Sequence, residues 1–164
     1  MVIFLNGSIN AGKTTVAKIL AKKLPNVALV EIDALRKMIA WMPIDQSVPI
    51  NLENAVSVIR CFSKRGLDVI VPYPLSADNY SYLMNELKDI GTKIHVFTLA
   101  PKLEIALTNR GTRELEDRER ERIRHHYRIG IHAPSFGEII DNSEQAPEDT
   151  ANYIFSKIDY PQKA

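Results

Sequence analysis

The sequence predicts an α/β domain built on a mostly parallel sheet. Two observations lead to this prediction: apolar runs of strand length recur along the 164 residues, and segments with a helical pattern separate them. Most of the runs are rich in valine and isoleucine with little polar alternation, which is typical of strands covered on both faces. Strands that alternate with helices form right-handed crossovers, and these favour a parallel sheet.

Five runs are predicted as strands and seven segments as helices. The strands are 2–5, 27–32, 68–73, 93–99 and 137–141. The helices are 13–23, 33–40, 51–64, 78–90, 101–109, 117–129 and 147–158. Three connecting stretches, 41–50, 111–122 and 142–149, are too irregular or too polar for the core. Ligands of an open parallel sheet bind beyond the carboxyl ends of its strands, and we expect these stretches at or near that edge.

The composition is that of an ordinary globular domain. The formal net charge is +1, which indicates neither a basic surface for nucleic acid nor an acidic tail for a basic partner. No apolar window reaches the length of a membrane span, and the first residues lack the basic region of a signal peptide. We therefore expect a cytoplasmic protein, a monomer or homodimer, without a membrane or nucleic-acid partner. The single cysteine, Cys61, is expected on a buried helix face.

A glycine-containing turn joins the first predicted strand to the first predicted helix. Its sequence, GSINAGKT from Gly7 to Thr14, fits the pattern G-x-x-x-x-G-K-[ST] in the strand–turn–helix context that the pattern requires. Glycines let backbone N–H groups curl around phosphate oxygens, and the helix N-terminus adds partial positive charge. Lys13 is suited to the β- and γ-phosphates and the Thr14 hydroxyl to Mg²⁺. The turn is therefore predicted to be a P-loop (Walker A motif) that binds ATP with Mg²⁺.

An acidic and a basic residue follow the second predicted strand. The guanine-binding motifs of GTPases do not occur. The third predicted strand ends without a carboxylate, so Asp33 is the nearest acidic residue at the carboxyl ends of the strands. Arg36 lies three residues further on and faces the same way on a helix. Asp33 is suited to accept the proton of an acceptor hydroxyl and to hold Mg²⁺, and Arg36 to hold the acceptor or the transferring phosphate. The alternative is a helix N-cap aspartate with an exposed arginine.

With these motifs the chain resembles the small P-loop kinases of the nucleoside monophosphate kinase superfamily, such as shikimate kinase, chloramphenicol phosphotransferase and polynucleotide kinase. The resemblance rests on the P-loop, the D-x-x-R pair, an arginine-rich segment after the fourth strand and the stretch IIDNSEQAPEDTA at 139–151. It implies a three-layer P-loop NTPase fold with a five-stranded parallel sheet of order 2-3-1-4-5 and helices on both faces. It also implies a lid, at about 110–124, that closes over ATP.

The resemblance implies nucleotide contacts beyond the P-loop. Arg110 and Arg113 stand where the lid arginines of such kinases lie, and lid closure would bring them to the phosphates while excluding water. The loop after the fifth strand would hold the adenine. The residues expected to bind nucleotide are Gly7, Asn10, Ala11, Gly12, Lys13, Thr14, Thr15, Arg110, Asn142 and Gln145, with Ser143 as a further lining residue. The residues expected to act in catalysis are Lys13, Asp33, Arg36, Arg110 and Arg113.

The later arginines of the charged segment are predicted to lie on a solvated helix. Charged residues four apart, such as Glu116 and Arg120, would form pairs along it. His125 and His126 have no partner at a metal-binding spacing, and we expect them to be surface or lid-packing residues.

The acceptor pocket is expected between the second helix, the 41–50 segment and the end of the third strand. Trp41, Met42 and Tyr73 would line it, a largely apolar set with few charges besides Arg36. The sequence thus predicts an ATP-dependent phosphotransferase whose acceptor is a neutral or mildly polar small molecule with a hydroxyl group. Two alternatives stay open: a nucleotide-binding regulatory protein without transfer activity, and a kinase for the 5′-hydroxyl of a polynucleotide.

Overall fold

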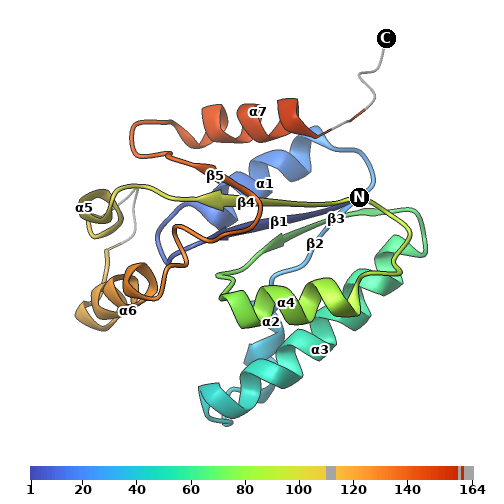
Figure 1. Ribbon diagram of the computed structural model, residues 1–164, viewed down its shortest axis with the longest axis horizontal. Helices are drawn as coiled ribbons and strands as arrows, with labels where there is room; N and C mark the ends of the chain where they lie inside the picture. Colours follow the sequence, from blue (N-terminus) through green and yellow to red (C-terminus); the bar gives the residue numbers. More distant parts are fainter. Residues whose placement is uncertain (110–113, 159, 161–164) are drawn as a thin grey trace.

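A five-stranded parallel sheet forms the middle layer of the molecule (Figure 1). The computed structural model describes residues 1–109, 114–158 and 160. The strands are β1 (Val2–Gly7), β2 (Val27–Leu29), β3 (Asp68–Pro72), β4 (Ile94–Leu99) and β5 (Glu138–Ile140). Their order is β2-β3-β1-β4-β5, and every neighbouring pair is parallel. The order 2-3-1-4-5 that the family resemblance implied is therefore confirmed.

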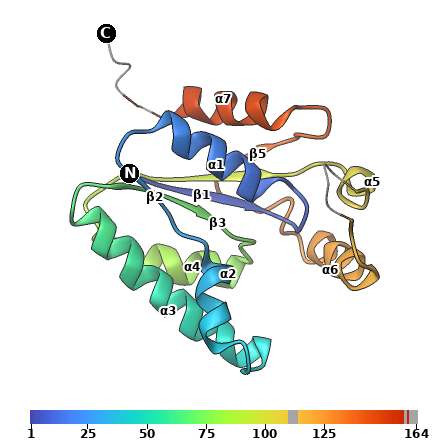
Figure 2. The ribbon, with the colours of Figure 1, turned by 180° about the vertical axis from the view of Figure 1, so that it is seen from behind.

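Helices cover both faces of this sheet. They are α1 (Lys13–Lys23), α2 (Ile32–Arg36), the 3₁₀ helix η1 (Lys37–Ile39), α3 (Ile44–Ser63), α4 (Ala77–Glu86), α5 (Leu103–Ala106), α6 (Asp117–Arg128) and α7 (Pro147–Lys157). In Figure 1 and in the reverse view of Figure 2, α1 and α7 lie on one face, whereas α3 and α4 lie on the other. The three-layer architecture is confirmed.

The residues of β1 alternate between the two halves of the core. Val2 and Phe4 belong to the cluster formed with α3 and α4, and Ile3 and Leu5 to the cluster formed with α1 and α7. All four side chains are fully buried. Burial on both faces explains why the strand is a continuous apolar run in the sequence. β1 is the central strand of the sheet, so the P-loop begins at the carboxyl end of the central strand.

The second strand is shorter than predicted. β2 ends at Leu29, and Ile32 begins α2 instead of closing a strand. Ile32 is buried in the core from the first turn of this helix, so its apolar side chain extended the strand-like run in the sequence. Asp33 therefore lies in a helix rather than at a strand end.

The 41–50 segment, predicted to be irregular, is mostly helical. α3 begins at Ile44 and includes Pro49 in its second turn. The helix continues through this proline because one of its faces is buried, with Ser47 and Asn51 one turn apart on it. These additional turns form one wall of the site described below.

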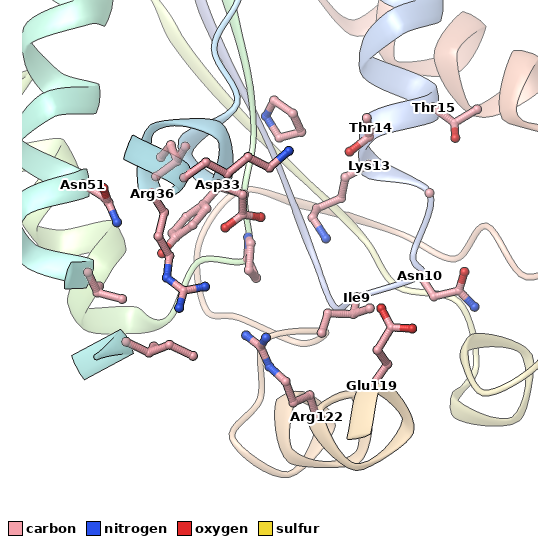
Figure 3. Close-up of a pocket in the computed structure, with 18 of the residues that line it drawn as sticks. Ile9, Asn10, Lys13, Thr14, Thr15, Asp33, Arg36, Asn51, Glu119 and Arg122 are labelled. Atoms are coloured by element: carbon pink, nitrogen blue, oxygen red, sulfur yellow. The ribbon is translucent and has the colours of Figure 1, made fainter. Parts of the chain in front are cut away.

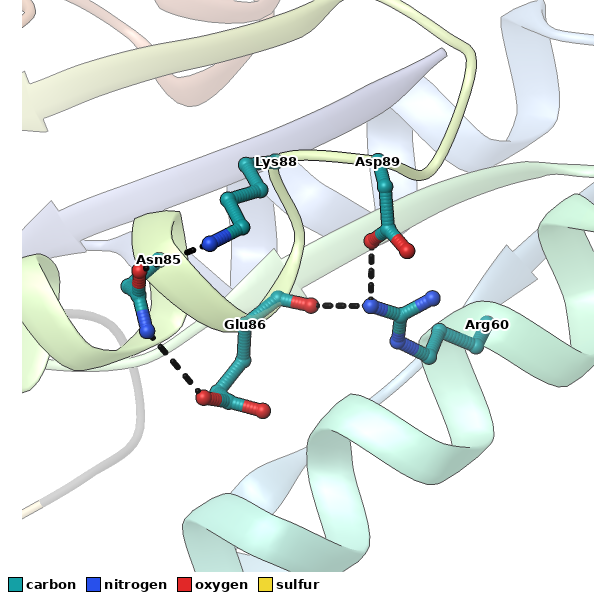
Figure 4. A network of polar contacts seen from close by, with 5 residues as sticks. All are labelled: Arg60, Asn85, Glu86, Lys88 and Asp89. Atoms are coloured by element: carbon teal, nitrogen blue, oxygen red, sulfur yellow. Dashed lines mark hydrogen bonds and ion pairs between the residues drawn. The ribbon is translucent and has the colours of Figure 1, made fainter.

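A side chain from α3 ends the next helix. α4 ends at Glu86, although the sequence pattern predicted a helix to residue 90. The Arg60 guanidinium donates hydrogen bonds to the Glu86 carbonyl and to the Asp89 carboxylate (Figure 4). Because the last carbonyls of a helix lack intrahelical partners, this contact stabilises the helix end where it is.

Two further predictions are wrong. α5 covers only four residues of the predicted helix 101–109, and the chain leaves the helix where the Asn10 amide binds the Ala106 carbonyl. Cys61 is exposed on α3 rather than buried, and Arg65 donates a hydrogen bond to its sulfur at 3.0 Å. Nowhere in the described part of the chain does a helix have the length and apolar character of a membrane span.

Candidate active site

The P-loop lies at the carboxyl end of β1. Gly7 ends the strand with a φ of 138°, and Gly12 is the N-cap of α1 with a φ of 96°. A Cβ atom on Gly7 would lie 2.5 Å from the Leu99 carbonyl oxygen of β4, so a larger residue does not fit there. Asn10 is also left-handed, with a φ of 63°. These conformations produce the tight turn that the motif predicts, and the N-terminal N–H groups of α1 follow directly, as an anion site requires.

A cavity of about 1190 Å³ opens beside the P-loop. Its walls come from the P-loop, α1, α2, the first turns of α3, the segment after β3 and α6. The lining residues are Ile9, Asn10, Gly12, Lys13, Thr14, Thr15, Ile32, Asp33, Arg36, Lys37, Ala40, Ile44, Val48, Asn51, Pro72, Tyr73, Pro74, Glu119, Arg122 and Pro147. Figure 3 shows Lys13 and Thr14 on one side and Asp33 and Arg36 on the other. The structure thus brings these four predicted residues together at the expected sheet edge.

Side chains of the P-loop attach it to neighbouring segments and to itself. Asn10 Nδ2 donates hydrogen bonds to the carbonyl groups of Ala106 and Thr108, both at 2.9 Å. Lys13 Nζ donates to the Ser8 carbonyl at 2.6 Å, across the loop. The loop is therefore held in its curled conformation by the protein's own groups, before any phosphate binds.

The loop after β5 also supports the P-loop. Asn142 is 3% exposed, and its Nδ2 donates to the Ala11 carbonyl at 3.0 Å. Gln145 Oε1 accepts a hydrogen bond from Thr150 Oγ1 at 2.9 Å, at the start of α7. Neither Asn142 nor Gln145 lines the cavity, and adenine contacts by these residues stay a prediction.

Ser8 connects the P-loop to α6. Its Oγ lies 3.2 Å from His126 Nδ1, and both side chains are buried. Burial, together with the positive charges of Lys13 and Arg122 and the neighbouring His125, lowers the pKa of His126 to about 4, so its imidazole is neutral near pH 7. His125 is exposed as expected, whereas His126 is a buried support of the P-loop.

α6 contributes two cavity residues that the sequence analysis did not identify, Glu119 and Arg122. Most arginines of this helix are exposed, as predicted, whereas Ile123 and His126 are buried on its inward side. Residues three and four apart share a helix face, so the spacing of 119, 122, 123 and 126 is the signal that could have identified its inward side. In Figure 3, Arg36 and Arg122 extend toward one another from opposite walls of the cavity.

The predicted pair between Glu116 and Arg120 is not formed. Glu116 is the N-cap of α6 and exchanges hydrogen bonds with Glu119 in a capping box. Arg120 donates instead to the Leu107 carbonyl and, at 3.3 Å, to Asn109 Oδ1, which ties α6 to the segment that follows α5. The predicted lid arginines, Arg110 and Arg113, lie outside the described residues.

Asp33 and Arg36 lie at the two ends of the short helix α2. Its N-cap is Glu31, so Asp33 is in the first turn and is not the capping residue that the alternative interpretation proposed. The Asp33 side chain is exposed toward the cavity. Burial raises the pKa of Tyr73, the Asp33 carboxylate raises it further, and the charges of Arg122 and Arg36 oppose this rise. Asp33, Arg36, Arg122 and Tyr73 all line this cavity, so the charges of the first three act on the Tyr73 phenol.

The side of the cavity opposite the P-loop, which contains Arg36 and Asn51, is where the acceptor pocket was predicted, and we call it the acceptor side. It is more charged than predicted. Trp41 and Met42 do not line it, and Trp41 is 80% exposed. Lys37 from η1 and Arg122 from α6 add charge to the cavity lining beside Arg36, whereas Figure 3 shows Glu119 next to Ile9 and Asn10 of the P-loop. The expectation of few charges besides Arg36 is wrong, because α6 is distant in sequence and only the tertiary fold brings it to this wall.

Thr14 and Asp33 fit a magnesium ion held partly by phosphate. A hydroxyl and a carboxylate are hard oxygen ligands, which Mg²⁺ prefers, and it usually takes only one or two protein groups besides phosphates and water. Both residues line the cavity that contains the P-loop. In the part of the chain that the structure describes, no cluster of three or more histidine, cysteine, aspartate or glutamate side chains could hold a metal by itself.

Comparisons with known proteins identify solved structures of the same fold. No protein-family model and no curated protein sequence matches the chain. The structure of the tunicamycin resistance protein of Deinococcus radiodurans is 22% identical, with a TM-score of 0.69 over 96% of this chain and 95% of that chain. A sugar kinase of Janibacter is 16% identical, with a TM-score of 0.71 over 94% and 92%.

A third structure contains bound ligands. The APS kinase of Mycobacterium tuberculosis, in complex with AMPPNP and APS, is 17% identical, with a TM-score of 0.64 over 94% of this chain and 95% of that chain. At such identities the likeness establishes the fold and nothing finer. The P-loop at the carboxyl end of the central strand and the sheet order agree with it. This protein therefore has the fold of the small P-loop kinases.

Proposed function

We propose that this protein is a kinase that transfers the γ-phosphate of ATP to a hydroxyl group of a small-molecule acceptor. One observation carries the proposal: Lys13 and Thr14 of the P-loop face Asp33 and Arg36 across one cavity. Phosphoryl transfer depends on positioning two substrates and on stabilising the charge between them, and this arrangement supplies groups for both.

Each side chain has a distinct part in the proposed transfer. The acceptor oxygen bonds to the γ-phosphorus as the bond from that phosphorus to the β–γ bridging oxygen breaks, and ADP leaves. The hydroxyl proton passes to the Asp33 carboxylate, which faces the cavity from α2. Lys13 stabilises the charge on the β- and γ-phosphates, and Arg36 and Arg122 stabilise the equatorial oxygens. Thr14 and Asp33 would hold Mg²⁺, which neutralises phosphate charge when bound.

Lys13 tests the nucleotide half of the proposal. In the structure its ammonium binds the Ser8 carbonyl, so it is already directed along the P-loop. We expect Lys13→Ala to lower turnover by about 10²–10³, the scale for losing one preorganised charge-stabilising group. Lys18→Ala, on the exposed face of the same helix, is the matched control. Wild-type turnover in Lys13→Ala would show that this loop does not bind the transferring phosphates.

A screen of hydroxyl compounds, followed by ADP release, tests the acceptor half. A kinase releases ADP faster with the right alcohol, whereas an ATP-dependent regulatory protein changes conformation with nucleotide and ignores acceptors. The screen includes a 5′-hydroxyl oligonucleotide, so that a polynucleotide kinase would be recognised. ATP binding without acceptor-dependent ADP release over the whole panel would overturn the proposed transfer.

A further inference from the structure

Two buried polar atoms on the acceptor side of the cavity have no hydrogen-bond partner among the described residues. They are Arg36 Nε and Asn51 Oδ1, and both residues line the cavity. Asn51 is 2% exposed, and Figure 3 shows it on the same side as Arg36. A buried polar group that is left unpaired lowers stability, so two of them in one pocket indicate a ligand that pairs with them.

The unpaired state of Asn51 is not shared by the buried polar residue one turn before it. Ser63 Oγ, at the other end of α3, is also unpaired among the described residues, but it does not line the cavity. Ser47 is the preceding buried polar residue on this face of α3, and its Oγ donates to the Ile44 carbonyl at 3.0 Å. Ser47 is thus satisfied within the helix, whereas the Asn51 amide lies one turn further on and faces the cavity. The unpaired Asn51 Oδ1 therefore belongs to the residue that lines the cavity, where a substrate is expected.

The hydrogen-bonding chemistry of the two atoms restricts the chemical class of the ligand. Arg36 Nε–H needs a hydrogen-bond acceptor, and Asn51 Oδ1 needs a donor. A carboxylate or phosphate would satisfy the first only, and an ammonium group would satisfy the second while being repelled by the guanidinium. Hydroxyl groups satisfy both, because each one donates one hydrogen bond and accepts others.

We propose that Asn51 is a specificity residue that, with Arg36, selects a polyhydroxylated acceptor. One hydroxyl of this acceptor lies at Asp33 for transfer, and neighbouring hydroxyls bind Arg36 Nε and Asn51 Oδ1. The proposal rests on the proposed kinase function and adds the class of acceptor, a polyol such as a sugar or cyclitol. Asn51 takes no part in the bond changes.

Binding without transfer tests the proposal separately from the kinase function. The protein is saturated with AMPPNP, and binding of cyclohexanol, a cyclohexane diol, myo-inositol and lactamide is measured by ligand-detected NMR. We expect wild-type protein to bind the polyols at least about tenfold more tightly than cyclohexanol, because a site built to pair with a hydroxyl rejects the analogue that lacks it. Asn51→Leu should lose this preference. Asn54→Leu, an exposed position on the same helix, should keep it.

Thermal denaturation of the free variants separates this role from a structural one. Asn51→Leu removes the buried, unpaired Oδ1 atom, so its melting temperature should equal or exceed that of the wild type. A structural asparagine would give a clear loss of stability instead, and that loss would overturn the proposal. Equal binding of cyclohexanol and the polyols, no polyol binding, or a preference for lactamide would also overturn it. Polyol binding without ADP release would contradict the kinase function alone.

Discussion

The P-loop side and the acceptor side of the cavity differ in how their polar side chains are satisfied. On the P-loop side Ser8, Asn10 and Lys13 each make a hydrogen bond that holds the loop or its neighbours. Asn142 holds the Ala11 carbonyl through Nδ2, whereas its Oδ1, which is outside the cavity lining, is unpaired among the described residues. On the acceptor side Arg36 Nε and Asn51 Oδ1 are buried without partners among the described residues. A triphosphate site stabilises charge best when its polar groups are already held in position, whereas the polar groups of an acceptor site can pair with the ligand. Under the proposed function, one cavity therefore combines a preorganised half with a half that the acceptor substrate completes.

Asp33 offers the largest test of the acceptor side. The carboxylate is exposed in the first turn of α2 and caps nothing, so Asp33→Asn should fold normally and bind ATP nearly as well as the wild type. Transfer at saturating ATP should fall by about 10²–10⁴, the range for losing a general base. Asp45→Asn, exposed at the start of α3, is the control. Transfer close to the wild-type rate would mean that another group accepts the proton.

Gly7 tests how rigidly the P-loop side is built. Gly7 and Gly91 both have positive φ values, of 138° and 74°, but only at Gly7 would a Cβ meet backbone, the Leu99 carbonyl oxygen at 2.5 Å. That carbonyl lies in the β1–β4 pairing and cannot move without disturbing the central strands. Gly7→Ala should therefore lose about 1–3 kcal/mol more free energy of unfolding than Gly91→Ala, as measured by urea denaturation. Equal losses would show that the turn is adaptable.

His126 makes the P-loop side sensitive to acid. Its pKa is about 4 in the folded protein and ordinarily 6.5, so between these values the unfolded chain binds more protons. The free energy of unfolding should consequently decrease as the pH falls from about 6.5 toward 4. His126→Gln should weaken this dependence, and His125→Gln, at an exposed position, should not. The measurement is urea denaturation across this pH range, and identical slopes in all three proteins would contradict the buried contact with Ser8.

Arg60 lies far from the cavity and should give the smallest effect. Its hydrogen bond lowers the pKa of Asp89, and its contact with the Glu86 carbonyl ends α4 (Figure 4). Both are near the surface, where such pairs contribute little. Arg60→Ala should reduce the melting temperature slightly, raise the pKa of Asp89 in an NMR titration and leave transfer unchanged. A large loss of transfer would show that the two regions are coupled.

Local patterns determined the fold class and the P-loop. The GSINAGKT turn carries its own conformational signal, because positive φ values at Gly7 and Gly12 and a helix start at Lys13 depend on adjacent residues. The strands were equally readable, since burial on both faces leaves continuous apolar runs. Ile32 is buried from the first turn of α2, and its apolar side chain made the predicted strand β2 too long.

The tertiary structure alone decided what completes the cavity. Arg122 and His126 come from α6, whose sequence is a charged segment without a recognised motif. Asn51 comes from a part of α3 that lies close to two prolines. Their roles depend on long-range packing. α6 contacts the P-loop through His126, and α3 packs against α2, where Asn51 Oδ1 is buried without a partner among the described residues. The sequence by itself determined a phosphate-binding turn, because its geometry is local. The acceptor side needed the fold, because the burial and pairing of each polar group there depend on residues distant in the chain.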